Sequence, residues 1–285
     1  MKNMMKKMLC GAAALCLMAS AAMAEFDAGK LIDVISREDG SGTRGAFVEL
    51  TGVEQKIDGK KVDMTTEDAQ ITNNTAVMMT TVAGDPYAIG YISLGSLNDS
   101  VKAVKVAGVE ATAENVKSGA YAVARPFNIA WKEEALSDAG KDFIAYIVSS
   151  EGQAIVNANG YVGSSDAAAY EAAAVSGKVV VAGSSSVSPV MEKLAEAYMA
   201  VNGDVVIEIQ TSDSTTGMTS AMEGGCEIGM ASRELKEAEA AVLSSRAIAM
   251  DGIAVIVNNE NPLEELSLEQ ICAIYTGETT AWNEL

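Results

Sequence analysis

Short apolar runs alternate with amphipathic segments along this chain, and that alternation restricts its fold more than any other feature. The runs typical of buried strands are "LIDVIS", "YAIGYISL", "VKAVKVA", "FNIAW", "KVVVAG", "DVVIEIQ", "EIGMA" and "AIAMDGIAVIVN". A helix is predicted over 189–201, where one apolar stripe comprises Val190, Leu194, Ala197, Tyr198 and Val201. Strands that alternate with helices predict an α/β fold with mostly parallel sheets.

Capping residues mark two further helical regions. Ser267 begins a capping box at the start of 268–275, and Gly277 lies just past its end. The segment 138–159 predicts one or two helices that end at Gly160. By contrast, the Ala- and Ser-rich segment 163–178 is predicted to be a surface connection, with at most one helical turn, and is the best linker candidate.

The N-terminus has the three-part pattern of a secretory signal peptide. "MKNMMKK" is followed by the apolar "MLCGAAALCLMAS" and by "AAMA" directly before Glu25, which predicts a signal peptide over 1–24. No later run reaches ~18 apolar residues, so we do not expect an integral membrane protein. Neither Cys10 nor Cys16 is preceded by a lipobox, and we expect a soluble protein in the periplasm or outside the cell.

The chain is strongly acidic. Removal of Lys2, Lys6 and Lys7 with the signal leaves 17 basic residues against 39 acidic ones, a net charge of −22. Such a surface repels nucleic acid and anionic membranes, so neither is an expected partner. Of the cysteines, Cys226 and Cys272 remain. We expect both to be buried apolar residues, and a disulfide between them is the less favoured alternative.

The sequence contains no histidine. This removes Ser-His-Asp and Cys-His nucleophile activation, zinc sites that use histidine, and the usual general base near pH 7. Hydrolytic chemistry therefore becomes a poor expectation.

Three hydroxyl-rich turns each follow an apolar strand and precede a helix. They are "SREDGSGT" at 36–43, "GSSSVSP" at 183–189 and "TSDSTTGM" at 211–218. The first N–H groups of a helix lack intrahelical partners and its dipole is positive there, so an anion is favoured. Ordinary helix capping explains any one such turn, because Ser, Thr and Asp are the commonest N-caps. Three turns in one chain favour an oxyanion site.

The first turn lacks the phosphate-loop motif of nucleotide-binding proteins. A phosphate loop requires Gly-Lys-Ser/Thr, whereas Gly42 is followed by Thr43 and Arg44. Gly40, Gly42 and Gly45 do have the G-x-G-x-x-G spacing of the dinucleotide fingerprint, but three glycines at this spacing are by themselves a weak signal.

Two charged residues in the first turn suggest a protonated oxyanion. Arg37 offers a bidentate fork to an anion, and Asp39 could accept the proton that such a ligand still carries. The alternative is a surface ion pair between Arg37 and Asp39, worth at most ~1 kcal/mol.

Six segments together resemble a known family. They are "SREDGSGTRGAF", "GSSSVSPVMEKLAEAY", "IGMASREL", "IAMDGIAVIVNNENP", "LEQICAIYTGETTAWNEL" and "FIAYIVSSEGQAIVNANGYV". The sequence is thereby similar, over essentially all of the chain after the signal, to the phosphate-binding proteins of ABC importers, the PstS family. The resemblance implies a two-lobed type II periplasmic-binding-protein fold that closes on inorganic phosphate and delivers it to ABC transporter permease subunits, without catalysis, cofactor or metal.

The resemblance also implies the phosphate-binding residues. They are Arg37, Asp39, Ser41, Gly42 and Thr43 in the first turn, and Ser185, Ser186, Ser214 and Ser232 in the other lobe. At the position of Ser232 some relatives carry Asp. The turn "TSDSTTG" is less Gly-rich than usual, and Asp213 is an addition to it.

The segments stand in a different order from that of the family. "GSSSVSP" is expected near the mature N-terminus, but here it follows "SREDGSGT", and the chain ends at "WNEL". This order predicts a circular permutation in which 163–178 joins the old termini. One lobe would comprise 25–124 plus 251–285, and the other 125–250. The alternatives are a segment swap between two copies, or an incomplete tandem gene.

Other functions remain open at this point. A receptor for a related oxyanion or a phosphate sensor would use the same residues, and a phosphatase on the same scaffold is a further alternative. Phosphate-ester turnover would distinguish the phosphatase from a binding protein.

Overall fold

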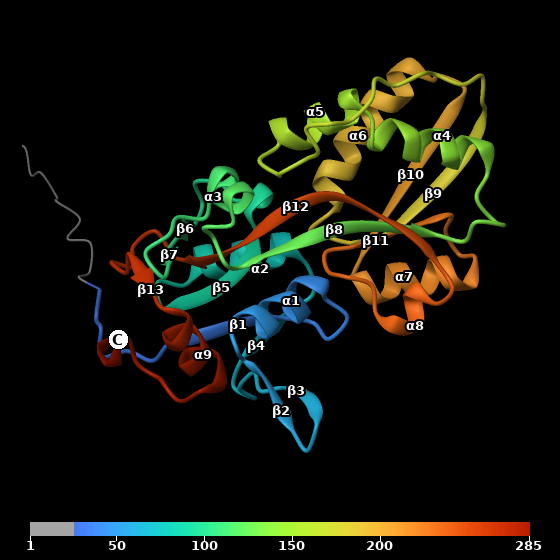
Figure 1. Ribbon diagram of the computed structural model, residues 1–285. Helices are drawn as coiled ribbons and strands as arrows, with labels where there is room; N and C mark the ends of the chain where they lie inside the picture. The colour runs from blue at the N-terminus through green and yellow to red at the C-terminus, as the bar shows by residue number, and fades with distance from the viewer. Residues whose placement is uncertain (1–25) are drawn as a thin grey trace, which may run out of the picture.

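The computed structural model describes residues 26–285, so the predicted signal peptide, 1–24, lies outside the described residues. Its backbone is a mixed α/β arrangement in which helices cover a curved central sheet (Figure 1). Within this part of the chain, no helix has both the length and the apolar character needed to span a membrane.

The central sheet has nine strands, in the order β10-β9-β11-β8-β12-β5-β1-β4, with β6 paired to β12. Their bounds are β1 Asp33–Arg37, β4 Gln70–Thr72, β5 Ala88–Ser93, β6 Lys102–Ala103, β8 Ala124–Trp131, β9 Gly177–Ser184, β10 Val205–Ser212, β11 Ile228–Ala231 and β12 Ser244–Val257. Pairing is parallel towards both ends of the sheet and antiparallel around β8 and β12. The expected α/β class is therefore confirmed, with a sheet that is mixed and continuous.

Two small ribbons and the helices complete the fold. β7 Lys105–Val106 pairs with β13 Glu265–Leu266, and β2 Glu54–Ile57 forms a hairpin with β3 Lys60–Asp63. The helices are α1 Gly42–Leu50, α2 Thr75–Gly84, α3 Ala113–Ser118, α4 Asp138–Ile147, α5 Ser150–Ala158, α6 Ser188–Val201, α7 Ser214–Glu223, α8 Glu237–Ala240 and α9 Leu268–Thr276, with 3-10 turns η1 Leu94–Ser96 and η2 Trp282–Glu284.

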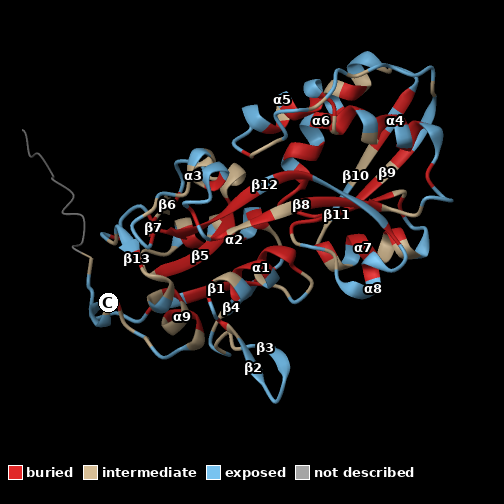
Figure 2. Ribbon diagram, viewed as in Figure 1, coloured by how far each residue is buried: buried red, intermediate tan, exposed pale blue. Residues whose placement is uncertain are grey.

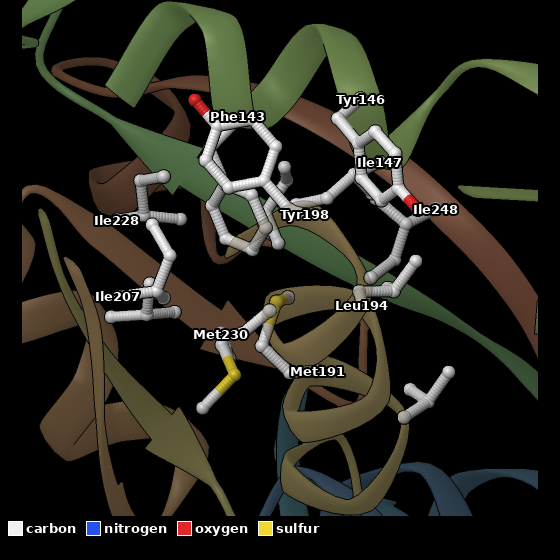
Figure 3. Close-up of a cluster of buried hydrophobic side chains, with 14 of the residues drawn as sticks. Phe143, Tyr146, Ile147, Met191, Leu194, Tyr198, Ile207, Ile228, Met230 and Ile248 are labelled. Carbon is white, nitrogen blue, oxygen red and sulfur yellow. The ribbon is translucent and has the colours of Figure 1, made fainter. Parts of the chain in front are cut away.

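The buried side chains form separate cores on the two sides of the molecule. One core packs α4 and α6 against the sheet, with Phe143, Met191 and Tyr198 at its centre (Figure 3). Another core surrounds Phe47 and Tyr275. Burial follows the strands and the inner helix faces, whereas the β2–β3 hairpin is exposed (Figure 2).

Strands β8 and β12 are the two connections between these cores. In β12, Ile248 belongs to the first core and Ile253 to the second. In β8, Phe127 packs in the first core and Ala124 packs against the second. Figure 1 shows both strands running side by side between the two groups of helices.

The helix predictions are largely confirmed. α9 begins after the Ser267 capping box and ends at Gly277 in the left-handed conformation. The segment 138–159 forms the two helices α4 and α5, and Gly160 has a φ of 83°. In α6, however, Val201 is 58% exposed, so its assignment to the apolar stripe was wrong; it stands at the last helical residue, beyond the packed turns.

The predicted connection lies on the surface. The described segment 163–176 contains neither helix nor strand, and most of it is exposed. Among the described cysteines, Cys226 and Cys272 are both free, and Cys226 packs in a small apolar cluster with Met218 and Leu243.

Candidate functional site

The three hydroxyl-rich turns meet at one place in the fold. Each lies where a strand ends and a helix begins: β1 to α1, β9 to α6, and β10 to α7. The turns contact one another directly, because the Thr215 N–H donates to the Gly40 carbonyl at 3.2 Å and the Thr43 and Ser186 hydroxyls are 2.8 Å apart. Residues more than 140 positions apart in sequence thus share one buried polar cluster.

Arg37 is the cation on one side of this cluster. It stands at the end of β1 with only 2% of its surface exposed. Its Nη2 donates to the Ser185 hydroxyl at 3.1 Å, and Nε and Nη2 donate to the Glu38 carboxylate at 2.7 Å each. The two bonds to Glu38 hold the guanidinium in one orientation.

A chain of hydroxyl contacts forms the centre of the cluster. Thr43 Oγ1 is 3.3 Å from Ser232 Oγ, and Ser184 Oγ donates to Ser232 Oγ at 3.0 Å. The Ser232 N–H donates to Ser214 Oγ at 3.1 Å. All four side chains are buried. Since each hydroxyl carries one rotatable proton, each can turn from its neighbour to an anion oxygen.

The remaining residues of the first turn have different positions. Ser41 caps α1, accepting from the Arg44 N–H, and Gly42 lies against Ser214. The Asp39 side chain is 99% exposed and pairs with Arg44 at 2.9 Å, so the structure does not bring it to the cluster. Nor does the alternative Arg37–Asp39 ion pair form, because Glu38 is the partner of Arg37.

Sequence reasoning missed three residues of the cluster. Thr75, the first residue of α2, places Oγ1 3.4 and 3.3 Å from the hydroxyls of Ser185 and Ser186. Arg125 in β8 donates from Nη2 to Thr43 Oγ1 at 2.9 Å. Ser184 was part of a recognised turn but was not singled out. In the sequence, Arg125 could have been noticed as a single arginine just before the apolar run "FNIAW". Thr75 could have been noticed as a hydroxyl residue directly after Asn74, the N-cap of α2.

Positive groups surround the cluster, and each of its two arginines is also paired with a carboxylate, Arg37 with Glu38 and Arg125 with Asp251. The guanidinium groups of Arg37 and Arg125 lie on two sides of the hydroxyls, and the positive N-terminal ends of α1, α6 and α7 contribute partial charge. Burial raises the pKa of Asp251, the partner of Arg125, to about 6, although Arg125 lowers it. Within the described residues, no group of three His, Cys, Asp or Glu side chains could hold a metal ion.

A cavity of about 690 Å³ adjoins the cluster. Its wall includes Thr75 and Ser185 from the cluster, together with Ser188 and Glu192 of α6. A larger cavity, of about 860 Å³, lies beneath the 163–171 connection and includes none of the clustered hydroxyl groups. Of these two cavities, only the smaller one is lined by side chains of the cluster.

Known proteins with similar sequences are named as phosphate-binding proteins. The family model described as "PBP superfamily domain" matches residues 18–151 and 168–285. Phosphate-binding protein PstS 2 of Streptococcus agalactiae is 56% identical over 256 residues, which are 89% of this chain and 87% of that protein. The phosphate-binding protein PstS of Bacillus subtilis is 32% identical over 113 residues, 39% of this chain and 38% of that protein.

A solved structure extends the similarity to the fold. The crystal structure of a phosphate-binding protein of a phosphate ABC transporter from Streptococcus pneumoniae has a TM-score of 0.71 and 46% sequence identity. The match covers 89% of this chain and 99% of that one.

Proposed function

Because the chain belongs to the PBP superfamily and, within it, to the PstS family of phosphate-binding proteins, we propose that it captures inorganic phosphate and delivers it to an ABC importer. The observation that carries the proposal is the buried contact of Arg37 with Ser185, 148 residues away in sequence, inside a cluster of hydroxyl donors. Such a cluster offers an anion many hydrogen bonds and no titratable nucleophile. Binding without catalysis is the chemistry that it supports.

Phosphate would replace the contacts that the hydroxyl groups make with one another. Arg37 offers a charged fork, while the hydroxyls of Ser41, Thr43, Ser185, Ser186, Ser214 and Ser232 and the backbone at Gly42 supply further donors. Charge-assisted hydrogen bonds of this kind are short and about twice as strong as neutral ones. Together these donors would take the place of the ligand's hydration shell.

Asp39 does not fit its expected role as proton acceptor. Its carboxylate is held on the surface by Arg44, which also donates to the Arg37 carbonyl at 2.8 Å. Capture through Asp39 would require that contact to break. We therefore assign the binding role to the remaining residues of the first turn.

We further propose two lobes and a permuted segment order. The cores divide the chain at β8 and β12, in accord with lobes of 25–124 plus 251–285 and of 125–250. The Bacillus subtilis match spans 39% of the chain, whereas the Streptococcus agalactiae match spans 89%. A permuted chain aligns collinearly with only one block of an unpermuted relative, and this supports the order proposed from the sequence. Export and a permease partner belong to the same proposal.

Titration calorimetry with phosphate, arsenate and sulfate tests the proposed function. We expect phosphate to bind the wild-type protein, and the arsenate and sulfate titrations show which oxyanion the site prefers. Arg37→Ala should weaken phosphate binding by about 100-fold, since a charged hydrogen-bond donor is lost from a buried site. Arg246→Ala is the matched control, because Arg246 is an exposed arginine on β12.

Three results would point elsewhere. Failure of the wild-type protein to bind phosphate, together with a neutral Arg37→Ala, would refute the proposal. Tighter binding of another oxyanion would make the protein a receptor for that anion. Turnover of a phosphate ester would favour the phosphatase.

A further inference from the structure

Arg125 lies where the two lobe-connecting strands meet. It is on β8, directly opposite Asp251 of β12 in the antiparallel register. Its Nη1 is 2.7 Å from Asp251 Oδ2, with 3% of the arginine side chain and none of the aspartate exposed. A buried ion pair therefore joins the two strands that run between the cores.

The same guanidinium reaches both halves of the candidate site. Nη2 donates to the hydroxyl of Thr43, at the start of α1, and Nε donates to the carbonyl of Ser232, after β11, at 3.0 Å. Thr43 belongs to one lobe and Ser232 to the other. One side chain thus contacts the lobe-connecting strand and a turn from each lobe.

The bond to Thr43 determines which way that hydroxyl can donate. A guanidinium has donors only, so Thr43 Oγ1 must accept from Arg125. The single proton of Thr43 then points away from Arg125, where its nearest partner is Ser186 Oγ at 2.8 Å. An anion that enters between Thr43 and Ser186 would meet a hydroxyl already oriented as a donor, which lowers the cost of reorganising it.

Asp251 in turn restricts Arg125. The ion pair fixes one branch of the guanidinium while the other branch points to Thr43. Arg125 also lies over the Phe127 ring, 5.2 Å from its centroid, which holds the plane of the group. The orientation of Thr43 is thus connected to the geometry of the lobe-connecting strands.

We propose that Arg125 is a positioning residue for anion binding, which holds the Thr43 hydroxyl as a donor and links it through Asp251 to the lobe-connecting strands. This inference rests on the proposed function, since it concerns the same phosphate site. It means that Arg125 raises phosphate affinity by orienting the Thr43 hydroxyl, in addition to forming the ion pair with Asp251.

A double-mutant cycle in the full chain distinguishes that route from a general electrostatic effect. Arg125→Gln and Thr43→Val are each expected to weaken phosphate binding about tenfold, the usual consequence of losing one hydrogen bond near a charge. If Arg125 acts through Thr43, adding Arg125→Gln to Thr43→Val changes the affinity by less than about twofold. Arg125→Lys, which keeps a charged donor, should recover most of the affinity lost in Arg125→Gln.

The cycle includes controls for folding and for the ligand itself. Arg125→Gln leaves Asp251 buried without its partner, so Arg125→Gln/Asp251→Asn is measured as well, and thermal unfolding is followed for every variant. Arg246→Gln controls for the loss of one positive charge. Phosphate binding by the wild-type protein is established first, so that failure of the proposed function is seen separately.

The outcomes are distinct. The proposal is supported if Arg125→Gln no longer changes phosphate affinity once Thr43 is Val. The same result is required when Asp251→Asn is also present. An equal loss with and without the Thr43 hydroxyl would overturn it, because Arg125 would then act on the anion directly. Unchanged affinity in Arg125→Gln/Asp251→Asn would also overturn it, because the pair would then contribute to stability alone.

Discussion

Gly42 and Ser214 approach each other so closely that a Cβ atom on Gly42 would overlap the Ser214 hydroxyl oxygen. The two residues begin α1 and α7, which belong to different lobes in the proposed division. The contact with the start of α7 therefore requires a glycine at position 42. Its own backbone does not require it, because Gly42 is absent from the residues with positive φ.

Gly42→Ala should hinder closure of the two proposed lobes over the site. The added methyl group overlaps Ser214, a contact that separation of the lobes would relieve, so we expect phosphate affinity to fall about 10-fold to 100-fold, at a cost of about 1–3 kcal/mol. Calorimetry measures the affinity, and small-angle scattering reports the separation of the lobes.

Gly45→Ala is the matched control for this prediction. Gly45 is in the same helix, and a Cβ there would meet nothing within 4 Å. Gly45→Ala should therefore keep the wild-type affinity and gain slightly in helix propensity. Equal affinities for the two variants would contradict the role assigned to the Gly42 contact.

Tyr170 should hold the surface segment 163–176 against the protein without changing phosphate affinity. Its hydroxyl donates to Asp142 Oδ2 at 2.6 Å, and Tyr198 and Asn202 donate to the same oxygen. Tyr170→Phe should lower the free energy of unfolding by about 1–2 kcal/mol, as expected for one lost bond to a carboxylate. Urea unfolding measures the loss, and phosphate affinity should stay within about twofold of wild type.

Tyr87→Phe is the comparison for Tyr170→Phe. The Tyr87 hydroxyl accepts one long exposed contact, 3.4 Å from the Asp27 nitrogen. Its removal should change stability by less than about 0.5 kcal/mol. A Tyr170→Phe protein as stable as Tyr87→Phe would show that the connection is not held by this hydroxyl.

The sequence was informative wherever a local pattern carried the signal. Capping residues located α9, and the strand-turn-helix context brought the three hydroxyl-rich turns together before any contact was known. The β2–β3 hairpin was missed although Asp58 and Gly59, both at positive φ, form the Asp-Gly pair that is typical of such turns.

Contacts between distant residues could not be derived in this way. Arg125 contacts Thr43 across 82 positions, and Arg37 contacts Ser185 across 148. Nothing in the composition of either segment indicates these pairings. The mixed character of the sheet could not be predicted for the same reason. An apolar run indicates that a strand is buried, but the antiparallel direction of β8 and β12 depends on which distant strands pair.

Glu239 should make stability depend on pH through its bidentate bond to Arg233, with N···O distances of 2.7 and 2.8 Å. Burial acts to raise the pKa of Glu239, but the bonds from Arg233 and from the Lys236 N–H outweigh it and lower the pKa below 4.5. A lowered folded pKa means that the stabilisation is complete above pH 4.5 and is lost as the pH falls through the folded value.

Glu239→Gln should therefore be less stable than wild type by about 2 kcal/mol at about pH 7, and the difference should shrink below about pH 4.5. Urea unfolding between about pH 3 and pH 7 measures it. Glu264→Gln, in an exposed pair with Lys102, should stay within about 0.5 kcal/mol of wild type. A Glu239→Gln deficit that does not change with pH would mean that packing, and not charge, stabilises this pair.

Association of phosphate should become faster as salt rises. The net charge of −22 that is expected after removal of the predicted signal peptide opposes an incoming anion over long distances, whereas Arg37 and the helix ends act at contact. Raising the ionic strength from about 0.01 to 0.1 M shortens the Debye length from about 30 Å to about 10 Å, which screens the long-range repulsion more than the contact interactions. Stopped-flow fluorescence in potassium chloride should show the on-rate increase by a few-fold over that range. An on-rate that decreases with salt would mean that local positive charge dominates the approach, and that the acidic surface does not control the encounter.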